Sequence, residues 1–374
     1  MFLTERELSR LETPCVVIDV DRAKKNISAL QAECDRRGVA LRPHVKTHKM
    51  IPFARMQVQA GARGITACKV SEAEVMADGG LDDIFIAYPM VGDFRVRRAI
   101  ALHRRIKRLI LAVDSLEGAR ALNAAAEEAG VTLEVRLEVD TGARRTGSPR
   151  DEALSLALDI AHTMKHLRLT GIYTFKSLIL DGRPTRDNAL AGQEEGRLMG
   201  DIARILRDAG IDIRDVSAGS TPTGLTCADT GLVTEIRPGT YIFGDLMMVR
   251  EHAAAPDEVA ARIYATVVST PGGQYAVIDG GTKTFPMDIT PMTAPDYYPG
   301  YAAVVGRDDL HLLRMNEEHG MITCDGPELG LRVGQKLELM PIHVCPAVNL
   351  QNEVYLLENG ALTKQKVDAR GMLV

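Results

Sequence analysis

Two residues near the end of the chain, His343 and Cys345, are of types that bind metal ions. They lie two apart in the segment 340–350, Met-Pro-Ile-His-Val-Cys-Pro-Ala-Val-Asn-Leu. We expect this segment to be extended, so that both side chains point to the same side. Imidazole and thiolate together suit zinc, and two protein ligands would leave positions open, as a catalytic metal requires. The alternative is a buried cysteine beside a partly buried histidine.

Lys46 lies in a second reactive segment, residues 41–49, Leu-Arg-Pro-His-Val-Lys-Thr-His-Lys. We expect this lysine to close the first strand of a barrel, at the carboxyl end where barrels carry catalytic residues. Burial and the surrounding histidines and basic residues would lower the pKa of its amine and free it to form a Schiff base. The alternative is a surface lysine in a basic loop.

A loop with the composition of a phosphate-binding site, Ser217-Ala-Gly-Ser-Thr-Pro-Thr-Gly224, follows a late strand. Barrels often hold phosphate at the loops after their last strands, through backbone N–H groups and hydroxyls. Gly219 allows close approach of the backbone, and Ser220 and Thr221 can donate hydrogen bonds. An ordinary Gly/Ser/Thr turn is the alternative.

Two other loops carry candidate residues. The segment 141–147, Thr-Gly-Ala-Arg-Arg-Thr-Gly, brings two arginines to the barrel mouth. One of them could face the ring nitrogen of a cofactor, or the loop could simply be solvated. The segment Arg237-Pro-Gly-Thr-Tyr241 is typical of a turn with one buried tyrosine.

The elements that would position these residues follow from the hydrophobic pattern. Between residues 36 and 245, short apolar runs alternate with amphipathic helical stretches, which indicates a parallel sheet covered by helices. The number and spacing of the runs predict a (β/α)8 barrel. A doubly wound open sheet is the alternative, but no GxGxxG turn follows an early strand. The predicted strands are 38–42, 64–70, 83–88, 108–114, 132–140, 167–175, 215–218 and 235–243.

The pattern changes after residue 250, where helical stretches become sparse and a smaller β domain is predicted. An early strand at 15–20 precedes the barrel and could pair with that domain. We therefore predict a barrel over residues 22–250, and a β domain that consists of residues 1–21 and 251–374 and carries the metal site. Its predicted strands are 259–269, 274–278, 311–314, 336–340, 353–357 and 362–367.

The composition excludes several classes of protein. With 45% apolar and 25% charged residues, the 374-residue chain has the mix of a soluble globular protein. The net charge of −5 and the lack of a long basic run argue against nucleic-acid binding. No apolar stretch is long enough for a membrane span, and the first residues lack a signal-peptide pattern. The six cysteines are scattered without a CxxC pair, which predicts a reduced, cytoplasmic setting.

A series of short motifs extends in order over nearly the whole chain. These are Thr13-Pro-Cys-Val-Val-Ile-Asp-Val-Asp21, Arg42-Pro-His-Val-Lys-Thr-His-Lys49, Cys68-Lys-Val-Ser-Glu-Ala-Glu74, Glu138-Val-Asp-Thr-Gly142, Gly219-Ser-Thr-Pro-Thr223, Arg237-Pro-Gly-Thr-Tyr241, Val277-Ile-Asp-Gly-Gly281, Glu318-His-Gly320, His343-Val-Cys-Pro346 and Ala369-Arg-Gly371. Each motif is short, but the ordered series is specific. It resembles the D-threonine aldolase and D-serine dehydratase family, which are pyridoxal-phosphate enzymes of the alanine-racemase-like fold.

The resemblance implies a pyridoxal-phosphate barrel with a β domain, usually as a homodimer with active sites near the interface. It also implies a divalent metal, with zinc as the first choice and manganese or magnesium as alternatives. Lys46 falls on the lysine that binds the cofactor as a Schiff base, and Arg145 on an arginine near the pyridine nitrogen. The cofactor would also contact Gly219, Ser220, Thr221 and Tyr241, and the metal would be bound by His343 and Cys345.

The chain departs from the family in the segment 173–178, Tyr-Thr-Phe-Lys-Ser-Leu. Phe175 replaces a tyrosine that is often found there. Lys176 adds a cation that could contact a second substrate carboxylate, although a surface-facing side chain is the preferred interpretation. The segment 246–249, Leu-Met-Met-Val, is also unusually apolar. Both segments should lie near the substrate.

The resemblance implies a lyase that acts on a D-β-hydroxy amino acid. Family members that resemble D-serine dehydratase carry His-x-Cys at the metal site, whereas aldolases commonly carry His-x-Asp. The pair His343 and Cys345 therefore favours β-elimination to a keto acid and ammonia. The first alternative is a D-threonine or 3-hydroxy-D-aspartate aldolase, which would release glycine and an aldehyde. Further alternatives are a metal-independent racemase of the same fold and a non-enzymatic pyridoxal-phosphate-binding protein, against which the β domain argues.

Overall fold

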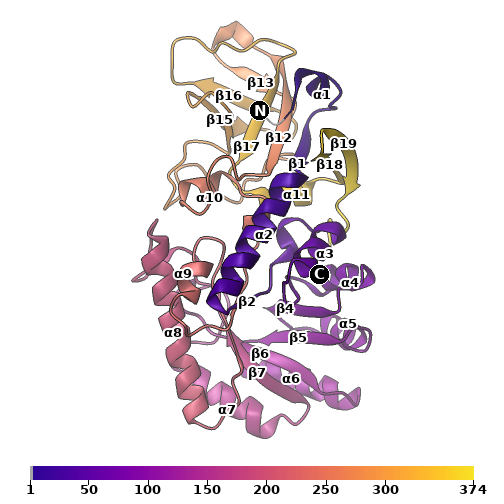
Figure 1. Ribbon diagram of the computed structural model, residues 1–374, viewed down its shortest axis with the longest axis vertical. Helices are drawn as coiled ribbons and strands as arrows, with labels where there is room; N and C mark the ends of the chain where they lie inside the picture. Colours follow the sequence, from indigo (N-terminus) through magenta and orange to yellow (C-terminus); the bar gives the residue numbers. More distant parts are fainter. Residues whose placement is uncertain (1–2) are drawn as a thin grey trace. The chain divides into compact units, whose positions relative to one another are not determined.

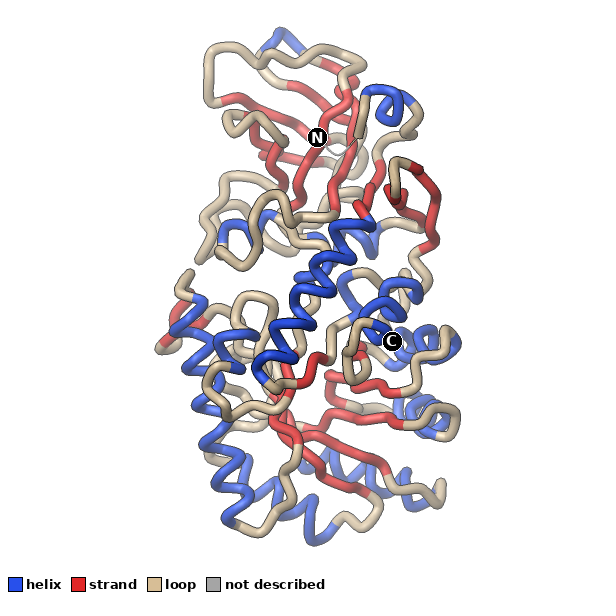
Figure 2. The backbone as a smooth tube through the Cα atoms, in the orientation of Figure 1, coloured by secondary structure: helices blue, strands red, loops and turns tan. Residues whose placement is uncertain are grey.

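The computed structural model describes residues 3–374 of the chain (Figures 1 and 2). Contacts among the Cα atoms divide it into two compact units. The barrel unit consists of Ser28–Lys46, Met50–Gly239 and Gly371–Val374. The β unit consists of the residues up to Ile27 together with Thr47–Lys49 and Thr240–Arg370. Within residues 3–374, no helix is both long and apolar enough to cross a membrane.

The barrel unit contains eight parallel strands in the order β2-β11-β10-β7-β6-β5-β4-β3. A parallel bridge between His44 and Thr66 joins the two ends of this order. The predicted (β/α)8 barrel is therefore confirmed, and Figure 1 shows helices outside its strands. The strands are β2 (Ala40–Leu41), β3 (Ile65–Ala67), β4 (Asp83–Pro89), β5 (Arg108–Val113), β6 (Leu133–Glu138), β7 (Leu167–Tyr173), β10 (Asp215–Ser217) and β11 (Glu235–Ile236). The helices are α2 (Val20–Arg37), which begins in the β unit, α3 (Ile51–Gln59), α4 (Val70–Asp78), α5 (Asp93–His103), α6 (Leu116–Glu128), α7 (Ala153–Thr163), α8 (Asn188–Asp208) and α9 (Gly224–Ala228).

The central strands β5 and β6 are buried on both faces along nearly their whole length, and the apolar sequence of β5 matches this burial. Strand β5, Arg-Leu-Ile-Leu-Ala-Val, is buried from its second residue onward. The following helix α6 begins where Ser115 accepts a hydrogen bond from the backbone N–H of Gly118 at 3.3 Å. Helix α8 begins in the same way at Asp187, whose carboxylate accepts from the Leu190 N–H at 2.9 Å.

The barrel interior also holds a buried network of charged side chains that the hydrophobic pattern did not predict. Glu235 accepts hydrogen bonds from Arg136 at 2.6 Å and from Arg42 at 2.8 Å, and all three side chains are fully buried. Burial alone would raise the pKa of Glu235, but the two guanidinium groups hold it well below its usual value. Arg136 also donates to Asp215 at 2.9 Å, which extends the network across the barrel.

The largest difference in strand length concerns the last predicted strand of the barrel. The run 235–243 was expected to be a single strand, but β11 ends at Ile236. Pro238 lacks an N–H group and cannot continue the ladder. The chain then forms the short 3-10 helix η2 (Thr240–Ile242) and the helix α10 (Leu246–Arg250).

The β unit contains a nine-stranded sheet in the order β13-β16-β15-β14-β17-β12-β1-β18-β19. Strand β1 pairs with β12 and with β18, as predicted for the early strand. Strands β14 and β16 were not predicted. The elements are β1 (Cys15–Asp19), β12 (Ala261–Ser269), β13 (Ala276–Ile278), β14 (Ala302–Val304), β15 (Leu310–Met315), β16 (Gly320–Cys324), β17 (Lys336–Pro341), β18 (Glu353–Glu358) and β19 (Ala361–Lys366), with the helices α1 (Glu5–Ser9) and α11 (Val344–Leu350).

Candidate active site

Lys46 lies in the 3-10 turn η1 (Val45–Thr47), a few residues after β2 ends at Leu41. It therefore stands at the carboxyl end of the first barrel strand, as expected, although the strand itself is shorter than predicted. Its side chain is half-buried, and its backbone N–H contacts Nδ1 of His44 at 3.4 Å. The guanidinium of Arg42, which was expected beside the lysine, is instead paired with Glu235 and Asp83, the first residues of β11 and β4.

Phe175 brings Lys46 and Arg145 to one aromatic ring. Nζ of Lys46 lies 5.9 Å from the centroid of this ring, and Cζ of Arg145 lies 4.5 Å from it. Both distances fall in the range of cation–π interactions. Lys46 and Arg145, two of the expected cofactor contacts, therefore both lie beside Phe175, where the chain departs from the family pattern. A planar pyridine ring fits this combination of an amine, an aromatic face and a guanidinium.

The loop after β10 places Gly219, Ser220 and Thr221 at the same end of the barrel. Gly219 has φ +86°, and a Cβ there would lie 2.7 Å from the Cα of Gly224. Only glycine therefore allows the loop to close onto α9. The Gly219 N–H donates to Glu195 at 3.0 Å, and the Ser220 N–H donates to Thr223 at 3.0 Å.

These contacts limit what the loop offers to a ligand. The Gly219 amide binds Glu195 of α8, and the amide and hydroxyl of Ser220 both contact the Thr223 hydroxyl at 3.0 Å. Glu195, which orients the loop, is buried, and its pKa is raised by that burial. Glu195 lies on α8, far from the loop in sequence, and no motif predicted its role.

Arg237 is a second residue that the sequence did not identify. It was interpreted as part of a simple turn, but its side chain is buried and donates to the Ser217 hydroxyl at 2.6 Å and to the Thr174 carbonyl. Its guanidinium also lies 5.1 Å from the Tyr173 ring. The available signals were its place directly after the short strand β11 and at the start of the motif Arg237-Pro-Gly-Thr-Tyr241. Tyr241, expected to be buried in this motif, lies in η2 of the β unit and is half-buried.

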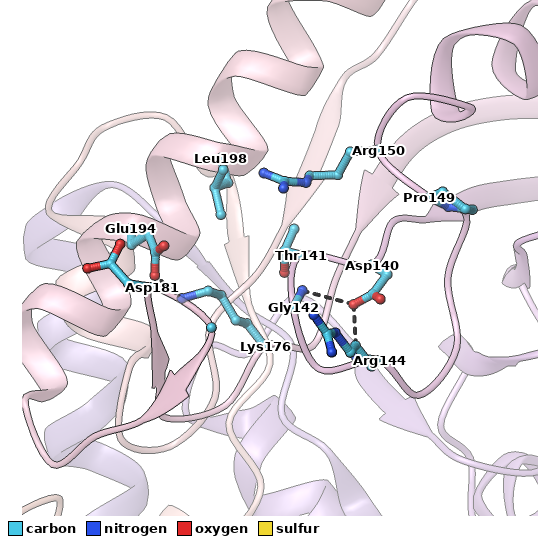
Figure 3. A pocket seen from close by; sticks show the side chains of 11 residues that line it. Asp140, Thr141, Gly142, Arg144, Pro149, Arg150, Lys176, Asp181, Glu194 and Leu198 are labelled. Atoms are coloured by element: carbon cyan, nitrogen blue, oxygen red, sulfur yellow. Dashed lines mark hydrogen bonds and ion pairs between the residues drawn. The ribbon is translucent and has the colours of Figure 1, made fainter.

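Lys176 does not face the surface, so the preferred interpretation of this residue is wrong. Its side chain is only 1% exposed, and it donates to the Glu194 carboxylate and the Ile179 carbonyl. It lines a cavity of about 410 Å³ formed by the loops after β6 and β7 together with α8 (Figure 3). Arg144 and Arg150 line the same cavity.

His343 and Cys345 lie together in the β unit, but not in an extended segment. His343 has extended backbone angles, whereas Cys345 belongs to the first turn of α11. The expected extended geometry is therefore wrong, because Pro346 fits a first helical turn, where no N–H partner is needed. The two side chains nevertheless approach each other and share a hydrogen bond.

The surroundings of the pair have the chemistry of a metal site. Asp288 accepts a hydrogen bond from Nδ1 of His343 at 2.5 Å, as carboxylates commonly do for metal-binding histidines. Burial alone would lower the pKa of His343, but the Cys345 thiol and the Asp288 carboxylate raise it well above its usual value. Cys345 itself is buried.

His343 and Cys345 supply two donor side chains for a metal. A metal held by these two side chains would keep positions for water or substrate, as a catalytic metal does. Within residues 3–374, no group of three or more His, Cys, Asp or Glu side chains converges on one point. The nitrogen and sulfur donors fit zinc.

Comparisons with protein families cover both parts of the chain. Residues 18–247 match the alanine racemase N-terminal domain, and residues 260–357 match the serine dehydratase domain. The chain is 37% identical to D-threo-3-hydroxyaspartate dehydratase of Delftia sp. strain HT23, over 90% of this chain and 92% of that protein. It is 30% identical to D-threonine aldolase of Arthrobacter sp., over 97% of this chain and 94% of that protein.

The solved structure of the Delftia dehydratase resembles this chain with a TM-score of 0.85 and 32% identity, over 96% of this chain and 98% of that one. The same enzyme has also been solved as a cysteine-to-alanine mutant in the metal-free form. Alanine racemase of Clostridium difficile, at 14% identity and a TM-score of 0.67, shares the fold.

Proposed function

Because this chain belongs to the alanine-racemase-like, fold-type III family of pyridoxal-phosphate lyases, we propose that it eliminates water from a D-β-hydroxy amino acid. The products are a 2-keto acid and ammonia. Relatives named for this chemistry include the Delftia dehydratase and D-serine dehydratase of Dictyostelium discoideum, the latter at 24% identity over 94% of this chain and 95% of that protein.

The cofactor would be held by groups at the carboxyl ends of the barrel strands. Lys46 would bind its aldehyde carbon, Phe175 and Arg145 would contact its ring, and the loop with Gly219, Ser220 and Thr221 would hold its phosphate, together with Tyr241. When bound, pyridoxal phosphate supplies an electron sink that makes the proton on Cα acidic. We propose residues 22–250 as the cofactor-binding domain, and residues 1–21 with 251–374 as the domain that carries the metal pair.

In this proposal, proton transfer is assigned to Lys46 and metal binding to His343 and Cys345. Nζ of Lys46 would act as the base that takes the proton from Cα of the substrate. The half-buried setting of this amine beside Phe175 limits access of water. His343 and Cys345 would hold a divalent metal, zinc in our proposal, which supplies a Lewis acid for the β-hydroxyl group. Loss of that hydroxyl and hydrolysis of the released enamine give the keto acid and ammonia.

One observation favours elimination over aldol cleavage, namely that the partner of His343 is a cysteine. Its thiol contacts the imidazole directly, so a metal bound by both would have a sulfur ligand. The sequence pattern of the family associates sulfur at this position with dehydratases and oxygen with aldolases. The relative at 37% identity is also named as a dehydratase.

The second candidate is an aldolase. It is favoured by the 30% identity to D-threonine aldolase of Arthrobacter sp.. In that case the β-hydroxyl would lose its proton, and the Cα–Cβ bond would break to give glycine and an aldehyde. A racemase is the third candidate and would keep its activity after metal removal.

A substrate panel separates these candidates. The purified protein, supplied with pyridoxal phosphate and Zn²⁺, is incubated with D-serine, D-threonine and D-threo-3-hydroxyaspartate. A dehydratase yields pyruvate, 2-oxobutanoate or oxaloacetate together with ammonia, whereas an aldolase yields glycine and the matching aldehyde. Lys46→Ala should abolish the reaction and the borohydride-reducible imine, and Lys165→Ala, at an exposed lysine between α7 and β7, serves as the control. If no substrate gives either product, the proposal is wrong.

We also propose that the enzyme acts as a homodimer in the cytoplasm. The scattered free cysteines suit a reduced compartment. Light scattering of the holoenzyme tests the assembly, and a mass of one chain would contradict it. Fractionation of cells that produce the protein tests the location.

A further inference from the structure

Asp245 is a buried carboxylate that joins two separate segments of the β unit. It directly precedes α10, and its side chain is fully buried. One oxygen, Oδ1, accepts a hydrogen bond from the Met248 N–H at 2.9 Å, within its own helix. The other, Oδ2, accepts from the Val344 N–H at 2.9 Å, about a hundred residues later in the chain. Both carboxylate oxygens are therefore used to hold backbone.

The hydrogen bond between the Val344 N–H and Asp245 lies at the start of α11, next to the proposed metal ligands. Val344 lies between His343 and Cys345 and is the first residue of α11. The first N–H groups of a helix have no partner inside that helix. The residue in the N-cap position, His343, provides no side-chain cap, since its imidazole binds Asp288. Asp245 thus caps α11 from another element.

Two further contacts fix the same segments. The backbone N–H of Met247 donates to the Ile342 carbonyl at 3.2 Å, one residue before His343. Leu246 and Ile342 belong to one apolar cluster, in which the partly buried Met247 and Val249 also pack. The unusually apolar run after Asp245 therefore supports the turn that carries the metal pair.

We infer that Asp245 is a positioning residue for the His343–Cys345 pair, whose backbone it holds so that imidazole and thiol converge on one metal ion. This inference rests on the proposed function, because it assumes that the pair binds a metal. Asp245 is not assigned as a ligand, since both of its oxygens accept backbone N–H groups. Partners of this kind typically contribute about 10- to 100-fold to metal affinity.

The chain offers a matched control for the capping role alone. Asp187 caps α8 through one hydrogen bond to the Leu190 N–H at 2.9 Å, the same length as the bonds of Asp245. It is exposed and lies in the barrel unit, and it holds only its own helix. Removal of its carboxylate should lower the melting temperature without any effect on metal binding.

The test measures Zn²⁺ affinity by competition with a chromophoric chelator, in the holoenzyme and in Asp245→Asn, Asp245→Ala, Asp187→Ala and His343→Ala. The asparagine variant keeps the shape of the side chain, so a loss of Zn²⁺ affinity in it is less easily explained by unfolding of the protein. We expect affinity to fall about tenfold in Asp245→Asn and up to about 100-fold in Asp245→Ala, with unchanged pyridoxal-phosphate absorbance. The sulfur-to-metal absorption band of the Co²⁺-loaded protein should shift in both. Asp187→Ala should bind Zn²⁺ like the wild type.

The outcomes separate this inference from the proposed function. Wild-type affinity in both Asp245 variants, with a loss in His343→Ala, overturns the positioning role alone. A wild-type protein that binds no Zn²⁺ overturns the metal part of the proposed function and the positioning role together. If Asp187→Ala lost as much Zn²⁺ affinity as Asp245→Ala, the loss would reflect general destabilisation of the protein. This result would also overturn the inference.

Discussion

The hydroxyl oxygen of Thr47 lies 3.2 Å from the sulfur of Cys345. Both side chains are buried, and both belong to the β unit. Thr47 is the residue directly after Lys46 in the chain, so its covalent neighbour is the proposed Schiff-base lysine. The hydroxyl of Thr240 is a second neighbour of the same sulfur, at 3.7 Å.

Thr47→Val should weaken metal binding. Valine keeps the shape of threonine but removes the hydroxyl partner of the Cys345 sulfur. Hydrogen bonds to charged groups contribute about 1.5–3 kcal/mol, so we expect Zn²⁺ affinity to fall about tenfold or more. Chelator competition measures this change. Thr240→Val, at the longer distance, should have a smaller effect, and an equal or larger effect of Thr240→Val would contradict the ranking.

Phe175→Leu should weaken binding of pyridoxal phosphate. The ring of Phe175 faces the cations of both Lys46 and Arg145, and leucine cannot make cation–π contacts. Each contact contributes about 0.5–1 kcal/mol, so affinity should fall about tenfold, while Phe175→Tyr should stay near wild type. Fluorescence titration of the cofactor-free protein with pyridoxal phosphate measures this affinity.

The control for this prediction is Phe94→Leu. Phe94 is exposed on α5, and its ring lies 4.8 Å from Cζ of Arg95, so a cation–π pair is removed outside the proposed site. Its cofactor affinity should equal that of the wild type. A similar loss in Phe94→Leu, or no loss in Phe175→Leu, would contradict the assignment of Phe175 to the cofactor.

The sequence allowed the barrel and the ordered motifs to be predicted, because both depend on local patterns. The alternating apolar runs predicted a parallel (β/α)8 barrel, and Lys46 was identified from its place at a strand end. The residues that were missed act through partners far away in sequence. Asp245 binds Val344, and Glu195 binds Gly219, across gaps that no spacing rule covers. The helical position of Cys345 was missed because the cap of α11 comes from another element.

The ion pair between the buried Lys176 and the partly exposed Glu194 can be tested by a double-mutant cycle. Glu194→Gln leaves the buried charge of Lys176 without this partner, so it should cost up to about 3 kcal/mol in the free energy of unfolding. Lys176→Met combined with Glu194→Gln should recover most of this loss, because neither charge remains. Urea unfolding measures Glu194→Gln, Lys176→Met and the double variant.

An exposed pair on α8 provides the comparison for that cycle. Arg204 and Asp208 are both exposed and lie 3.7 Å apart. Asp208→Asn should therefore change the free energy of unfolding by less than about 0.5 kcal/mol. If Glu194→Gln proves as mild as Asp208→Asn, Lys176 is not buried in solution, and the surface-facing interpretation would be restored.

Acid should destabilise the barrel through Glu134 on β6. This carboxylate is 6% exposed, and it accepts hydrogen bonds from Arg108 at 2.5 Å and from Thr170 at 2.9 Å. Burial alone would raise its pKa, but Arg108 and its other partners lower the pKa to about 2, from an ordinary value of 4.5. A carboxylate with a lowered pKa stabilises the fold fully above its unfolded-state pKa and loses that contribution as pH falls.

The free energy of unfolding should therefore fall by about 3 kcal/mol between pH 4.5 and pH 2 from Glu134 alone. Urea unfolding at a series of pH values measures the wild type and Glu134→Gln. The glutamine variant cannot carry the charge at any pH, so the stability difference between the two proteins should be largest at neutral pH and shrink as the pH falls through this window. A difference that stays constant from pH 7 to pH 2 would show that the loss in Glu134→Gln comes from packing, and that the ion pair with Arg108 contributes no net stability.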